Sequence, residues 1–60
     1  MRVNVYHAAD TTYLINVRDT DALMEEHGLT ERETCAMEDE LKSVGRYWLG
    51  EFYLTRRAGQ

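Results

Sequence analysis

The 60-residue sequence contains no proline, a single cysteine and no long apolar run. Cys35 has no partner for an intrachain disulfide, and no Cys/His cluster has the spacing of a zinc site. No segment approaches the roughly 18 consecutive apolar residues of a membrane span, and the first residues lack the apolar core of a secretion signal. We therefore expect a protein of the reducing cytoplasm, with no membrane association.

The length predicts one domain over residues 1–60, stabilised by packing or by a partner chain. A chain of this size buries only about 60% of the surface that its unfolded form exposes, so a large substrate cavity is not expected. Neighbouring helical carboxylates such as Glu25 and Glu26 point in different directions, and acids near Cys35 disfavour its reactive thiolate. We expect no enzyme activity, no catalytic residues, no cofactor and no metal site.

Charge is distributed unevenly along the chain, although the net charge of -4 is moderate. Residues 19–40 contain nine acids and one base, Arg32, which gives this segment a charge of -8, while the remainder carries +4. Soluble helices normally intersperse both signs, and self-repulsion destabilises a small domain. The acidic segment is therefore the strongest functional signal. A solvated face that only keeps the protein soluble is the alternative interpretation.

Residues 2–7 and 13–18 each alternate between two sets of side chains, with a polar break between the two runs. Val3 and Val5 share one face of the first run, and Ile15 and Val17 share one face of the second. Two runs of period 2 joined by a few turn-forming residues predict an antiparallel β-hairpin.

A short helix is predicted over residues 20–27. Asp19 is placed to cap its start, and Gly28 fits the left-handed position that ends a helix. Leu29 is expected to pack back on Met24, as in a Schellman ending. The short helix and the next one should therefore meet at a tight corner.

A long helix is predicted between Thr30 and Gly45. Thr30 and Glu33 have the spacing of a capping box, and Gly45 fits the left-handed position after the last turn. The apolar side chains recur at i, i+4 and i+7, as expected for one buried stripe. These residues are Met37, Leu41 and Val44.

The aromatic segment 46–55 predicts a third strand, with Gly50 at a bulge or a close backbone approach. Alternatively, Trp48 and Phe52 continue the long helix, but Gly45, Gly50 and the low helix propensity of aromatic residues disfavour this. The predicted fold class is α+β: a three-stranded antiparallel β-sheet with one short and one long α-helix on one face, in the order ββααβ. The predicted core is Val3, Val5, Ile15, Val17, Met37, Leu41, Val44, Trp48, Phe52 and Leu54.

Carboxylates on the two helices are the candidate binding residues. A helix of the predicted length holds them on a rigid support along about 20 Å. The electric field of such an array can guide the protein toward a basic cleft on a partner. The carboxylates can then occupy that cleft as a phosphate backbone does. The side chains selected for contact with a basic partner are Glu25, Glu26, Glu31, Glu38 and Asp39.

The sheet face turned away from the helices is a second candidate surface. It is predicted to carry Tyr6, Tyr47, Leu49 and Tyr53. Aromatic side chains on a sheet stack nucleotide bases in some proteins, although cross-strand pairing explains these residues equally well. Two terminal bases, Arg56 and Arg57, are opposed by the acidic segment, so we expect no direct nucleic-acid binding.

In chain order, the predicted elements are the hairpin RVNVYHA and TYLINVR, the short helix DTDALMEEHG, the long acidic helix TERETCAMEDELKSVG and the aromatic strand RYWLGEFYLT. With these elements and its size, the chain resembles small phage-encoded anti-CRISPR proteins, in particular inhibitors of type I-C systems. The resemblance covers nearly the whole chain. It implies a non-enzymatic inhibitor that binds a Cas protein or a type I surveillance complex in the cytoplasm of a bacterial host cell and blocks target DNA engagement.

The acidic helices would then act as a DNA mimic, and we expect a monomer. The alternative function is that of a small phage or plasmid regulatory protein, either an antitoxin or a helix-turn-helix-like transcription factor. The segment HGLTERE resembles the corner of a helix-turn-helix. A recognition helix carries bases toward the major groove, however, whereas this one carries acids.

Overall fold

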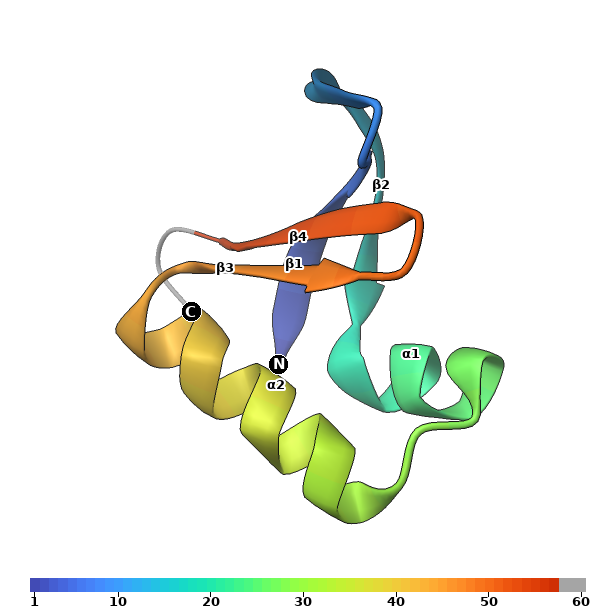
Figure 1. The fold of residues 1–60 in the computed structure, drawn as a ribbon, viewed down its shortest axis with the longest axis vertical. Coiled ribbons are helices and arrows are strands. Elements are labelled where there is room, and N and C mark those ends of the chain that lie inside the picture. Colours follow the sequence, from blue (N-terminus) through green and yellow to red (C-terminus); the bar gives the residue numbers. More distant parts are fainter. Residues whose placement is uncertain (58–60) are drawn as a thin grey trace.

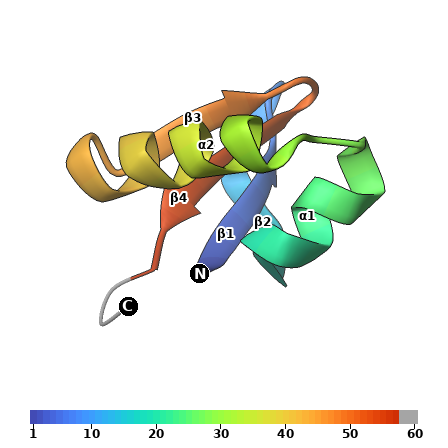
Figure 2. The same ribbon diagram turned by 90° about the horizontal axis from the view of Figure 1, so that it is seen from below.

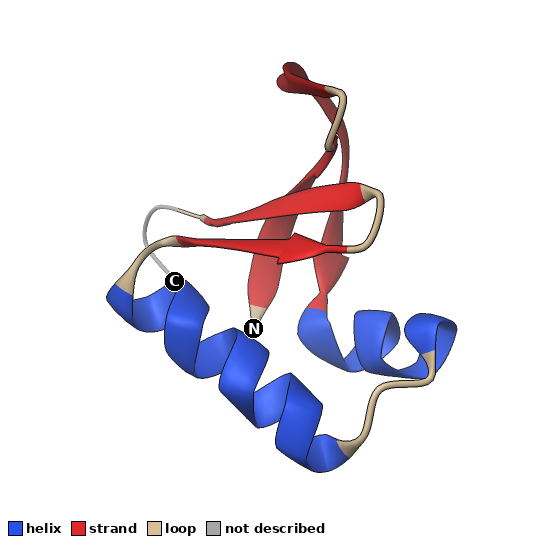
Figure 3. Ribbon diagram, viewed as in Figure 1, coloured by secondary structure: helices blue, strands red, loops and turns tan. Residues whose placement is uncertain are grey.

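The chain forms four strands and two helices in a computed structural model that describes residues 1–57 (Figure 1). Figure 3 shows the two strand pairs and, between them in the chain, the two helices. The elements are β1 (Arg2–His7), β2 (Asp10–Asp19), α1 (Thr20–His27), α2 (Glu31–Ser43), β3 (Arg46–Leu49) and β4 (Phe52–Arg56).

The aromatic C-terminal segment forms a hairpin, so the sheet has four strands and the prediction of three was wrong. Gly50 and Glu51 are the two turn residues, with Leu49 opposite Phe52. Gly50 has a φ of 58°, whereas no residue other than glycine in the described chain has a positive φ. A positive φ at the first central position is typical of a type II′ turn, which glycine adopts without strain. The α+β class, the antiparallel sheet and the two helices are confirmed.

The strand order is β2-β1-β4-β3, and every neighbouring pair is antiparallel. β1 therefore lies between its own hairpin partner β2 and the C-terminal strand β4. Figure 1 shows the two hairpins crossing at a steep angle, which is the appearance of a strongly twisted sheet.

The predicted N-terminal hairpin is confirmed, but its register shifts twice, between Val5 and Tyr6 and between Tyr6 and His7. Ile15 is an extra residue between the pairs Val5–Asn16 and Tyr6–Leu14. A bulge interrupts the simple alternation of side chains along a strand. Near the bulge, the residues of the second strand of this hairpin consequently do not lie on the faces of the sheet that were predicted for them.

α1 begins and ends as predicted. The carboxylate of Asp19 accepts a hydrogen bond of 3.0 Å from the amide of Asp21. Gly28 is left-handed, with a φ of 65°, and the amide of Leu29 donates to the carbonyl of Met24 at 2.9 Å. This is the hydrogen bond of a Schellman ending.

α2 also has the predicted ends. The Thr30 hydroxyl accepts from the amide of Glu33 at 3.1 Å, and the Glu33 carboxylate accepts from the amide of Thr30 at 3.0 Å. Gly45 follows the helix with a φ of 94°. The Arg56 guanidinium donates to the carbonyl of Lys42 at 2.9 Å and so places a cation at the negative end of the helix dipole.

Both helices pack on the same face of the sheet, because their buried side chains join one core cluster with those of β1 and β4. In Figure 1 the two helices lie below the crossing hairpins, and Figure 2 shows α2 running alongside β3 and β4 while α1 lies near β2. The core consists of Val3, Val5, Leu23, Met37, Leu41 and Leu54.

Several predicted core residues lie elsewhere. Ile15, Val44 and Trp48 are 43%, 61% and 55% exposed. The bulge displaces Ile15, and Val44 lies after the last turn of α2. Within β3, Leu49 packs against the core, so its neighbour Trp48 faces outward. Val17 lies opposite Asn4, on the face away from the core, and both Val17 and Phe52 are only half-buried.

Candidate functional site

A shallow groove between α1 and α2 gathers part of the acidic segment. Its volume is about 200 Å³, below the roughly 300–1,000 Å³ of typical small-molecule sites. Three of the lining residues carry carboxylates and none carries a cation. The groove is lined by Asp21 and Met24 of α1 and by Glu31, Thr34, Cys35 and Glu38 of α2.

Two of the five predicted binding residues, Glu31 and Glu38, line this groove. They are seven positions apart, so two helical turns place them on one side of α2. Asp21 was not selected from the sequence, because only the packing of α1 against α2 brings it to the same groove. Its place in the first turn of α1, next to the helix N-terminus, is the signal that was available.

Glu38 is held in place by a contact between the two helices. The buried hydroxyl of Thr20 donates a hydrogen bond to a carboxylate oxygen of Glu38. Thr20 is completely buried, and its amide donates to the carbonyl of Met1 at 2.8 Å. One threonine therefore anchors the start of α1 to both the N-terminus and α2.

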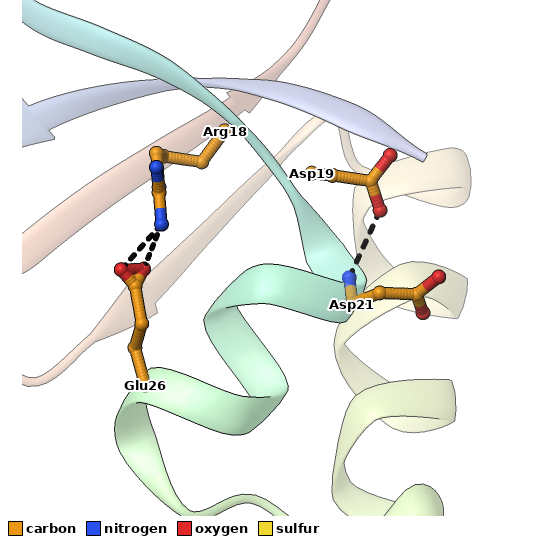
Figure 4. Close-up of polar contacts among 4 residues, drawn as sticks. All are labelled: Arg18, Asp19, Asp21 and Glu26. Atoms are coloured by element: carbon orange, nitrogen blue, oxygen red, sulfur yellow. Dashed lines mark hydrogen bonds and ion pairs between the residues drawn. The ribbon is translucent and has the colours of Figure 1, made fainter.

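The structure separates the other three predicted binding residues from the groove. Glu26 pairs with the Arg18 guanidinium, on the side of α1 that faces β2 (Figure 4). This pair lines a second, smaller pocket of about 100 Å³. Glu25 and Asp39 are exposed and line neither of these two pockets.

The arginines near the C-terminus do not neutralise the groove. Arg56 donates to the end of α2, and Arg57 donates to the side-chain oxygen of Asn4 at 2.9 Å. Among residues 1–57 the ion pairs are those of Arg18 with Glu26 and of the terminal amine with Asp19. The groove carboxylates are thus free of a cationic partner within the described chain.

Two carboxyl groups outside the groove have a lowered pKa. The amide of Asp21 donates to Asp19 and lowers its pKa (Figure 4). The nearby terminal amine, 3.6 Å from the Asp19 carboxylate, also lowers this pKa. The hydroxyl and the amide of Thr12 both donate to Asp10 and lower its pKa. Both groups serve local structure, namely a helix cap and a hairpin turn.

The remaining candidates are placed as follows. Cys35 is exposed at the groove, and both histidines pack edge-on against Phe52, with ring centroids 6.4 Å away for His7 and 5.7 Å for His27. Within the described chain, no group of three His, Cys, Asp or Glu side chains is arranged to hold a metal ion. None of the helices in residues 1–57 has both the length and the apolar character needed to cross a membrane.

Comparison with protein-family models, with curated proteins and with solved structures found no match.

Proposed function

We propose that this protein is a non-enzymatic inhibitor whose acidic helices bind the basic, DNA-binding surface of a Cas protein or a type I surveillance complex. The observation that carries the proposal is the three-carboxylate groove between α1 and α2, which no cation lines. The resemblance to anti-CRISPR inhibitors of type I-C systems supplies the choice of target.

The charge density of the helices supports mimicry of a nucleic-acid strand. α1 and α2 carry eight carboxylates against two cationic side chains, Arg32 and Lys42. The net six charges lie over a combined helix length of about 32 Å, or roughly one charge per 5 Å. One DNA strand carries a phosphate about every 3.4 Å along the axis. A basic cleft that accepts a DNA strand would therefore meet roughly two thirds of the charge density of that strand.

Rigidity also supports the proposal, because a fixed array loses little entropy on binding. Both helices have intact caps, and the Thr20 hydroxyl holds Glu38. The alternative function, a helix-turn-helix regulator, requires α2 to enter the major groove between the two phosphate backbones. Its five carboxylates oppose that approach.

The test is binding to a purified type I-C surveillance complex, measured by calorimetry at several salt concentrations. The variant Asp21→Lys/Glu31→Lys reverses two exposed charges that line the groove and leaves the contact between Thr20 and Glu38 intact. We expect at least tenfold weaker binding and a shallower salt dependence.

The matched control is Glu40→Lys/Glu51→Lys. It makes the same change in net charge at two exposed positions away from the groove. If both double variants bind as the wild type does while circular dichroism shows intact folds, electrostatic mimicry is wrong. If both weaken binding equally, net charge rather than the groove surface governs the interaction, and the proposed site is wrong.

A further inference from the structure

The face of the sheet opposite the helices, here called the outer sheet face, carries three aromatic rings, of which Trp48 is exposed and Tyr6 and Tyr53 are half-buried. Tyr6 of β1, Tyr53 of β4 and Trp48 of β3 lie opposite one another in the strand register. Their neighbours Val5, Leu54 and Leu49 point into the core or pack against it, so the three rings point away from it.

The rings form a continuous row across three adjacent strands. Ring centroids are 5.9 Å apart for Tyr6 and Tyr53, and 4.4 Å apart for Trp48 and Tyr53. Trp48 ends the row and is 55% exposed. A large exposed indole in so small a protein indicates a binding surface more often than an isolated exposed leucine does. The row therefore presents π-faces and edges that the helix layer does not cover.

Arginines lie on the same face, beside the row. Arg2 precedes the buried Val3, and Arg46 lies two residues before Trp48, so both side chains are on the outer sheet face. Arg57 reaches this face through its hydrogen bond to Asn4. Along β3, Arg46 and Trp48 are separated by about 7 Å, at roughly 3.3 Å per residue. Cations thus gather at one end of the face and rings at the other.

The acids of the chain are largely absent from this face. Asp19, opposite Arg2, is the one acid at an outer-face position in the described strands. Its carboxylate is already engaged with the amide of Asp21 and the terminal amine. The acidic helices pack on the other face of the sheet.

We propose that the outer sheet face binds single-stranded nucleic acid. Unpaired bases stack on aromatic side chains irrespective of sequence, and arginines contact the phosphates. The row of rings and the adjacent arginines match an extended strand, with bases over the rings and backbone over the cations. A duplex keeps its bases stacked inside, so the rings cannot reach them.

This inference departs from the expectation of no nucleic-acid binding, which counted Arg56 and Arg57 as the available bases. The structure assigns Arg56 to the end of α2 and adds Arg2 and Arg46 to Arg57. It is independent of the proposed inhibitor function, because the two surfaces lie on opposite sides of the sheet.

The experiment measures binding of fluorescein-labelled oligo(dT) and oligo(U) by anisotropy, together with quenching of Trp48, the one tryptophan of the chain. We expect quenching on binding, and at least tenfold weaker binding of a duplex of the same length. Three phosphate contacts predict a slope of about -2 in a plot of log K against log salt, at about -0.7 per phosphate. Arg46→Gln should reduce the slope to about -1.4, and Arg32→Gln on α2 should leave it unchanged.

A matched pair of variants isolates stacking from packing. Trp48→Phe keeps an aromatic ring and Trp48→Leu keeps only apolar bulk, so the leucine variant should bind at least fivefold more weakly than the phenylalanine variant. Equal affinity of the two folded variants overturns the proposal, as does duplex binding as tight as that of oligo(dT). Displacement of oligo(dT) by an equal concentration of oligo-glutamate also overturns it, because the face would then recognise acidic peptides.

Discussion

The contact of Thr20 with Glu38 gives the sharpest stability prediction. Thr20 is completely buried at the start of α1, and its hydroxyl donates to a carboxylate on α2. Thr20→Val removes this donor while it preserves the shape of the side chain.

The expected loss follows from the two ends of the hydrogen bond. A hydrogen bond to a charged group contributes about 1.5–3 kcal/mol. Glu38 is half-buried, so its freed carboxylate regains water, and the added methyl of valine is itself buried. Both effects reduce the expected loss in the free energy of unfolding to about 1 kcal/mol. For a domain of this size, that loss lowers the melting temperature by about 4–8 °C.

The assay is thermal and urea unfolding followed by far-ultraviolet circular dichroism, arranged as a double-mutant cycle with Glu38→Ala. In the Glu38→Ala background, Thr20→Val should be neutral or stabilising, because the hydroxyl has lost its acceptor. Thr34→Val is the matched control: Thr34 is also buried, but its hydroxyl donates to the carbonyl of Thr30 at 2.9 Å. The reasoning is refuted if Thr20→Val lowers stability equally in both backgrounds.

Three further predictions concern the core, a turn and a cap. Leu41→Ala removes a completely buried side chain and should lower the free energy of unfolding by about 2–5 kcal/mol, out of roughly 3–9 kcal/mol for a domain of this size; the midpoint of urea unfolding should therefore fall markedly. Gly50→Ala places a Cβ at a φ of 58° and should cost about 1–2 kcal/mol, measured the same way. Asp19→Asn keeps the cap of α1 but removes a carboxyl whose pKa is lowered by the amide of Asp21. That lowered pKa contributes stability above about pH 4 that is lost on acidification, so the variant should lose less stability between pH 7 and pH 3 than the wild type.

Helix ends were predictable from the sequence because their interactions are local. The Asp19 cap, the Gly28 ending and the Thr30 capping box each involve residues within a few positions of one another. The spacing of Met37 and Leu41 likewise predicted the buried stripe of α2. Interactions between residues that are close in the sequence determine these features, so the sequence alone is enough to predict them.

The C-terminal hairpin was missed because one glycine permits two outcomes. Gly50 within an aromatic run is compatible with a bulge in one strand or a turn between two strands. Which outcome occurs depends on β1, more than forty residues earlier in the chain, whose free edge β4 occupies. The turn at Gly50 also determines which face of the sheet Trp48 and Leu49 occupy, because the alternation of side chains between the two faces starts again after a turn.

The candidate site was predictable only within a single element. Glu31 and Glu38 share one side of α2, and periodicity alone brings them together. Asp21 joins them, and Glu26 leaves them for Arg18, because of the angle at which α1 follows β2. No periodicity in the sequence encodes that angle.

The separation of charge between two faces follows from the order of the elements. The acidic stretch 19–40 forms α1 and most of α2, whereas the more basic ends of the chain form the two hairpins. Because strands and helices pack as separate layers, a difference along the chain becomes a difference across the molecule. Substitutions on the acidic helices should therefore change binding to a basic protein and leave the outer sheet face intact. Substitutions of Trp48 or Arg46 should do the reverse, since the sheet lies between the two surfaces.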